Sequence, residues 1–127
     1  MILLTGYKGF IGSHFLKYLE NEAERDVIGI DMDNAWDFMA KFNGWKNVDL
    51  IIHNGAISAT TEKNWMKISH YNQTFTAHLF AHAIEHKIPI KYASSASVYG
   101  DALSEPMTED HPYNNKNFYG ATKICGE

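Results

Sequence analysis

The chain opens with Met1-Ile2-Leu3-Leu4-Thr5-Gly6-Tyr7-Lys8-Gly9-Phe10-Ile11-Gly12, and this stretch decides the fold. A short apolar run that ends at a glycine is typical of a buried parallel strand. Apolar residues then recur at helical spacing from Gly12 to Glu20, so a helix follows the turn directly. The stretch therefore predicts a strand, a tight turn and a helix in immediate succession.

The turn carries three glycines with the spacing G-x-x-G-x-x-G. Gly6 permits the sharp turn, Gly9 lets the backbone approach a pyrophosphate, and Gly12 lets the helix lie close to the strand. Free N–H groups and the positive end of the helix dipole add to a phosphate site. A strand before the turn and a helix after it distinguish such a site from an ordinary glycine turn. We therefore expect a dinucleotide-binding site here.

Further strands and helices alternate along the chain. Strands are expected at 26–31, 48–53 and 90–94, and helices at 35–42, 64–87 and from 117 onward. Residues 101–117 hold two prolines and several Asn and Asp residues, which predict an irregular loop. Alternating strands and helices predict a parallel sheet with right-handed crossovers. The expected fold class is α/β, the N-terminal portion of a Rossmann-like doubly wound sheet with about four strands.

The final predicted helix has no strand after it and nothing obvious against which to pack its apolar face. We therefore expect residues 1–127 to be one dinucleotide-binding domain, truncated just after the helix with Tyr119 begins. In this interpretation the chain is the front part of a longer protein, and the substrate domain is absent.

Composition bounds the function further. Of the 127 residues, 45% are hydrophobic and 20% charged, which is typical of one folded domain. The net charge of −4 argues against nucleic-acid binding, which needs a basic face. Cys125 is the single cysteine and is expected to be a buried thiol, so a reducing compartment is the default. The four-residue apolar run at the N-terminus indicates neither a signal peptide nor a membrane span, and a cytoplasmic location is expected.

Asp31 lies 19 residues beyond Gly12, at the C-terminal end of the second predicted strand. An acid at this position can accept a hydrogen bond from the 2′-OH of an adenosine ribose, and its charge repels a 2′-phosphate. Asp31 therefore favours NAD over NADP. The alternative is that it only caps the helix that follows.

Tyr119 and Lys123 are spaced to share one face of the last predicted helix. A nearby ammonium and a positive nicotinamide ring both favour a phenolate, so Tyr119 can serve as a base. A Tyr-x-x-x-Lys pair alone is common. Here it follows the serine-rich segment 92–100, which begins at the C-terminal end of a predicted strand, where open α/β sheets bind ligands. The combination predicts the active site of a dehydrogenase.

These motifs resemble those of the extended short-chain dehydrogenase/reductase family, the NAD-dependent epimerases and dehydratases. They are Gly6-x-x-Gly9-Phe10-Ile11-Gly12-Ser13, Ser94-Ser95-Ala96-Ser97-Val98-Tyr99-Gly100 and Tyr119-x-x-x-Lys123. Two further stretches, 53–62 and 88–95, most resemble the ADP-glyceromanno-heptose 6-epimerases, and Thr60-Thr61-Glu62 is their most discriminating feature. The resemblance covers nearly the whole chain and is weak over residues 32–47.

The resemblance implies roles for particular residues. Ser95, Tyr119 and Lys123 become the catalytic hydroxyl, the acid/base and its supporting lysine; Ser95 is chosen because it precedes Ala-x-Val-Tyr-Gly. The residues implied to bind the cofactor are Gly6, Gly9, Phe10, Ile11, Gly12, Asp31, Asn54, Gly55, Ala56, Ser58, Asn72, Tyr119 and Lys123.

The resemblance also implies a function. It is the transient oxidation and re-reduction of a sugar carbinol by a nicotinamide-dependent nucleotide-sugar epimerase, which forms a homo-oligomer when full-length. A UDP- or dTDP-sugar 4-epimerase or 4,6-dehydratase is an alternative, and a non-catalytic dinucleotide-binding module is another. The heptose epimerases generally use NADP, whereas Asp31 favours NAD, so both cofactors stay open.

Two features depart from the family pattern. Only residues 32–49 lie between the second strand and Leu50 of the third, and the extra strand usual in the family is not expected there. In the family the C-terminal half supplies the substrate domain and, in the heptose epimerases, a second acid/base lysine, and we expect neither within these 127 residues.

His78, His82 and His86 recur every four residues on the long predicted helix, a spacing that can serve a metal ion. No cysteine or carboxylate pattern completes such a site, and a solvated or subunit-facing helix edge explains the histidines as well. We therefore expect no metal site.

Overall fold

The computed structural model describes residues 1–101 and 103–127, and a four-stranded parallel sheet forms its centre. The strands are β1 (Ile2–Thr5), β2 (Val27–Ile30), β3 (Leu50–His53) and β4 (Ile90–Tyr92), in the order β2-β1-β3-β4. Thr5 at the end of β1 is in register with Ile30 on β2 and His53 on β3. The predicted α/β class and parallel sheet are confirmed.

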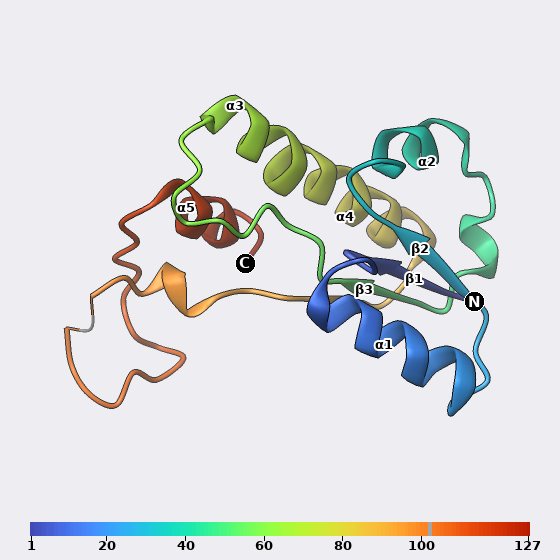
Figure 1. The fold of residues 1–127 in the computed structure, drawn as a ribbon, viewed down its shortest axis with the longest axis horizontal. Coiled ribbons are helices and arrows are strands. Elements are labelled where there is room, and N and C mark those ends of the chain that lie inside the picture. The colour runs from blue at the N-terminus through green and yellow to red at the C-terminus, as the bar shows by residue number, and fades with distance from the viewer. Residues whose placement is uncertain (102) are drawn as a thin grey trace.

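Helices cover both faces of the sheet. The helix α1 (Phe10–Asn21) connects β1 to β2 on one face, while α2 (Ala35–Lys41) and α4 (Phe75–His86) lie together on the other (Figure 1). The chain steps from β1 to β2 in one direction and from β3 to β4 in the other. Right-handed crossovers then place the connecting helices on opposite faces, as doubly wound sheets require. None of the described helices is long and apolar enough to cross a membrane.

The long helix expected over 64–87 forms with a changed pitch in its middle. It comprises α3 (Trp65–Ile68), the π-helical stretch η2 (Ser69–Thr74) and α4. Such π-helical turns occur frequently at functional sites. Lys87 ends the helix in the left-handed conformation, with φ of 56°.

The last helix, α5 (Phe118–Ile124), packs against η2 and the short turn η3 (Ala96–Val98) that follows β4. The side chain of Asn117 caps it by accepting a hydrogen bond from the Gly120 N–H at 2.7 Å. In Figure 1 this helix lies beside α3 and η2, away from α1. Contacts with these helical segments therefore hold α5 at the C-terminal edge of the sheet.

The core on the α2/α4 face fills the space between sheet and helices. Leu3, Ile51 and Leu79 are fully buried there. Residues 32–49, all of which the structure describes, contain α2 and the single turn η1 (Trp45–Asn47) but no strand, as expected. Trp45 is only 5% exposed, and its ring packs edge-on against that of Phe42, with the ring centroids 5.1 Å apart. An aromatic cluster thus closes this side of the sheet.

A candidate dinucleotide cleft

An open cleft of about 390 Å³ lies at the C-terminal ends of β1 and β3. These two strands flank the point where the direction of the chain reverses, which is the ligand-binding position in open α/β sheets. Sequence segments that lie far apart line it: the glycine turn, the end of β2, residues 54–58, the end of β4 and α5. The predicted site residues in its wall are Gly6, Gly9, Phe10, Ile11, Asp31, Asn54, Gly55, Ala56, Ser58, Tyr119 and Lys123.

The glycine turn is packed too tightly for side chains at two of its three glycines. Gly6 has a positive φ of 71°, and a Cβ there would lie 2.7 Å from the Cα of Gly55. A Cβ on Gly12 would lie 2.0 Å from the carbonyl oxygen of Gly6. At Gly9 a Cβ would meet only that same oxygen at 3.3 Å, so this position borders open space. Gly12 is therefore a packing residue, while Gly9 faces the cleft.

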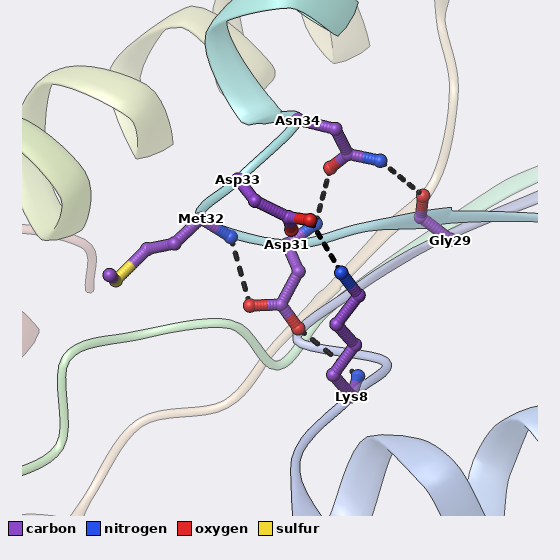
Figure 2. A network of polar contacts seen from close by, with 6 residues as sticks. All are labelled: Lys8, Gly29, Asp31, Met32, Asp33 and Asn34. Atoms are coloured by element: carbon purple, nitrogen blue, oxygen red, sulfur yellow. Dashed lines mark hydrogen bonds and ion pairs between the residues drawn. The ribbon is translucent and has the colours of Figure 1, made fainter.

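Asp31 holds the glycine turn against the end of β2 (Figure 2). Its Oδ2 accepts a hydrogen bond from the Lys8 N–H at 3.1 Å, and its Oδ1 accepts one from the Met32 N–H at 2.8 Å. Asn34 supports the turn by accepting from the Asp31 N–H at 2.7 Å and donating to the Gly29 carbonyl at 3.2 Å. The carboxylate is thus oriented by backbone groups at the rim of the cleft.

A second contact across this rim was not expected from the sequence. The Lys8 ammonium lies 2.5 Å from a carboxylate oxygen of Asp33, and both side chains are at least half exposed. The hydrogen bond between them raises the pKa of Lys8 and lowers that of Asp33. Lys8 is on the glycine turn and Asp33 follows β2. The ion pair therefore joins the turn to the end of β2 beside Asp31. No spacing in the sequence indicated this partnership.

His53, at the end of β3, sits in the middle of a buried hydrogen-bond chain. Its Nδ1 is 2.7 Å from the Thr5 hydroxyl, and its Nε2 is 2.8 Å from the Thr76 hydroxyl. Because Thr76 donates to the carbonyl of Asn72, it must accept from Nε2–H. Nδ1 then accepts from Thr5, whose oxygen receives the Gly55 N–H at 2.8 Å. The directions require a neutral ring, and burial lowers the pKa of His53 to about 3.

Asn72 continues this chain from η2 into the wall of the cleft. Its Oδ1 accepts from the Ile57 N–H at 2.8 Å, and its Nδ2 donates to the Ile57 carbonyl and to the Thr122 hydroxyl, both at 3.1 Å. Thr122 in turn donates to the carbonyl of Tyr119 at 2.7 Å. Asn72 is 3% exposed and does not line the cleft, so it holds the 54–58 loop and α5 in place from behind.

Tyr119 and Lys123 meet at the α5 side of the cleft. The Lys123 ammonium is 5.8 Å from the centre of the Tyr119 ring and 4.6 Å from that of Tyr92. Only 2% of Lys123 is exposed, and its ammonium donates to the Ala93 carbonyl at 2.7 Å. Burial lowers the pKa of this ammonium to about 8. The structure thus brings together the phenol and the cation that the sequence paired.

Two neighbouring serines, Ser94 and Ser95, follow β4 where a catalytic hydroxyl is expected, and they lie in different surroundings. Ser94 lines the cleft and donates to the carboxylate of Glu127. Ser95 is half-buried outside the cleft wall, and its oxygen accepts the Ser97 N–H at 3.1 Å as the cap of η3. The family resemblance implies Ser95 as the catalytic hydroxyl, whereas the structure places Ser94 in the wall of the cleft.

The state of Cys125 differs from the expectation. The sequence predicted a buried thiol, but the residue is exposed at the end of α5, where its Sγ receives a 3.1 Å contact from the Gln73 side-chain amide. The reason is that α5 packs through Gly120, Thr122 and Lys123, whereas Cys125 follows the last helical residue and faces solvent.

A model of the NAD dependent epimerase/dehydratase family matches residues 2–127, nearly the whole chain. Among solved structures, MoeE5 in complex with UDP-glucose and NAD is 26% identical with a TM-score of 0.82, over 98% of this chain and 46% of that one. A short-chain dehydrogenase/reductase superfamily protein from Agrobacterium tumefaciens with bound NAD is 26% identical, with a TM-score of 0.83, over 99% and 42%.

The ADP-L-glycero-D-manno-heptose-6-epimerase of Helicobacter pylori shares the fold. It is 24% identical with a TM-score of 0.79, over 98% of this chain and 48% of that chain. The chain therefore spans about half the length of the proteins that it matches.

The buried state of His53 predicts a specific loss of stability in acid. Its pKa falls from 6.5 to about 3 on folding, so the unfolded chain binds an extra proton between these values. The folding free energy contributed by neutral His53 is complete above pH 6.5 and is lost as the pH falls toward 3. The expected slope reaches about 1.4 kcal/mol per pH unit. Urea unfolding of the parent and of His53→Gln at several pH values measures it. Equal slopes in both proteins would contradict the prediction.

Proposed function

The chain belongs to the NAD dependent epimerase/dehydratase family, and we propose that it forms the cofactor-binding, catalytic half of a nucleotide-sugar epimerase. One observation carries the proposal: a single cleft has the glycine turn and Asp31 at one end, and Tyr119 and Lys123 at the other. In a bound dinucleotide, Asp31 would face the adenosine, the glycine turn the pyrophosphate, and Tyr119 with Lys123 the nicotinamide.

The residues of the cleft fit a nicotinamide dinucleotide. The cradle at Gly9 is open because that residue lacks a Cβ, and the first turn of α1 contains no acidic side chain that would repel a phosphate. The carboxylate of Asp31 lies at the rim, where an adenosine ribose would bring its hydroxyls. A bound nicotinamide supplies reversible hydride exchange with a sugar carbinol carbon.

The protein groups handle the proton that accompanies this exchange. We assign to Tyr119 the removal of the carbinol O–H proton and its later return. The buried Lys123 ammonium, fixed by the Ala93 carbonyl, stabilises the phenolate by its charge. Ser95 stays the proposed hydroxyl that holds the sugar oxygen; Ser94, which lines the cleft, is the competing candidate.

The proposal names an ADP-heptose as the substrate, with inversion at the sugar 6-position. The Thr60-Thr61-Glu62 segment supports this choice by its resemblance to heptose epimerases. MoeE5, which is similar over this chain, binds UDP-glucose, and this favours a UDP- or dTDP-sugar 4-epimerase or dehydratase as the second candidate. In either case the proposal includes a reducing, cytoplasmic location, which the single cysteine favours.

Replacing Gly9 by valine should abolish NAD binding while leaving the fold intact. The valine side chain enters the open space where the pyrophosphate is proposed to lie, and the backbone of Gly9 has a negative φ that valine tolerates. Isothermal titration calorimetry with NAD measures affinity, and circular dichroism checks the fold. A folded Gly9→Val chain that binds NAD as well as the parent would show that the turn is only structural.

The charges around Asp31 predict a preference for NAD over NADP. Asp31 should disfavour the binding of a 2′-phosphate by about 1–2 kcal/mol. The nearby Lys8 ammonium, which could attract that phosphate, is already paired with the Asp33 carboxylate. Lys41, on α2, has its ammonium 2.5 Å from a carboxylate oxygen of Asp37. Asp33→Asn should therefore release Lys8 and increase NADP affinity several-fold relative to NAD, while the control Asp33→Asn with Lys8→Met should not. Tighter binding of NADP than of NAD by the parent chain would contradict the preference.

Residues 1–127 alone should bind cofactor but show no measurable epimerase turnover. They correspond to 42–48% of the matched chains, and a sugar misplaced by about 1 Å can lose about a hundredfold in rate. The assay offers ADP-heptose and UDP-glucose to residues 1–127 and to a version extended through any downstream reading frame. Activity is expected only in the extended protein, and there Tyr119→Phe should remove it. Turnover by residues 1–127 would show that they form a minimal enzyme.

A further inference from the structure

Three side chains of types that can ligate a metal ion converge on the last turn of α4. His82, Glu85 and His86 each offer one ligand atom, and these atoms lie within 4.8 Å of one another. The Glu85 carboxylate is 3.8 Å from Nδ1 of His82 and 3.9 Å from Nε2 of His86. Glu85, three residues after His82 and next to His86, therefore supplies a carboxylate that the histidine spacing alone did not indicate.

Trp45 fixes the planes of the two imidazole rings. The His82 ring stacks on the Trp45 indole with centroids 4.1 Å apart and planes 10° apart. The His86 ring is parallel to the same indole within 5°, and the two imidazoles are 6.2 Å apart. Ligands held in this way lose little side-chain freedom when they bind an ion, which favours binding.

One ring nitrogen of His82, the Nδ1 atom, is buried without a hydrogen-bond partner among the described residues. A buried polar atom without a partner costs free energy and often indicates an ion or water at that position. The negative end of the α4 dipole, one turn away, adds attraction for a cation.

We propose that His82, Glu85 and His86 bind a divalent transition-metal ion of the Zn²⁺ class. Two imidazoles and one carboxylate are ligands that Zn²⁺ accepts, whereas Mg²⁺ and Ca²⁺ prefer oxygen alone. Zinc bonds of about 2.0–2.2 Å require the donor atoms to close by roughly 1 Å. The Glu85 side chain, 68% of which is accessible, can move toward an ion, and the two imidazole nitrogens must also approach each other. Solvent provides the remaining ligand position.

This site is separate from the dinucleotide cleft. The cleft lies at the C-terminal ends of β1 and β3, whereas α4 runs back along the sheet and ends at His86, just before β4 begins. An ion there would hold the His82 and His86 rings in the orientation in which they stack on Trp45 of η1. The proposal is thus independent of the cofactor and of the sugar.

Calorimetric titration of ZnCl₂ into the metal-free chain tests the site. All proteins carry Cys125→Ser, which removes the exposed thiol as a competing ligand. We expect one saturable ion per chain. Glu85→Gln and His86→Gln should each weaken it by about tenfold or more, and His78→Gln, an exposed histidine on the same helix, should not. The melting temperature should rise with Zn²⁺ only in the proteins that retain the site.

Three outcomes would overturn the proposal: no saturable binding by the parent, unchanged binding by Glu85→Gln or His86→Gln, or equal weakening by His78→Gln. Glu85→Gln changes an exposed side chain, so it reports on the site even if His86→Gln disturbs the packing on Trp45.

Discussion

The buried hydrogen-bond chain through His53 is the constraint on which the cleft depends. It starts at the Gly55 N–H, passes through Thr5, His53 and Thr76, and ends at the carbonyl of Asn72. Each hydroxyl donates in one direction and accepts from the other, so the chain works only with a neutral imidazole. Because it spans β1, β3 and η2, it sets the relative position of the glycine turn, the 54–58 loop and the long helix.

Asn72 extends the same constraint to the chemistry proposed for α5. Its amide holds both backbone groups of Ile57 and the hydroxyl of Thr122, within the turn that carries Tyr119. The π-helical pitch of η2 includes this residue. A polar network therefore ties the side chains proposed for proton transfer to the cleft wall, and the Asn72 amide joins the 54–58 loop to α5.

The segment between β2 and β3 shows how a short connection is accommodated. With no strand over 32–49, the aromatic residues of α2 and η1 close the face of the sheet, and Trp45 becomes their centre. The same indole stacks on His82 and lies parallel to His86. Packing that compensates for a short loop therefore also orders the side chains of the proposed metal site.

The sequence by itself determined the order of elements, the parallel sheet and the position of the glycine turn. These follow from local patterns: apolar runs, helical periodicity and residues that only a tight turn requires. It also placed Asp31, Tyr119 and Lys123 at the ends of elements whose topology brings them to one edge. Only the tertiary structure decided which side chains pair across that edge. Lys8 with Asp33, His53 with Thr5 and Thr76, and Glu85 between two histidines all depend on side-chain directions and on burial. Those quantities arise when separate elements pack together, and no spacing along the chain encodes them.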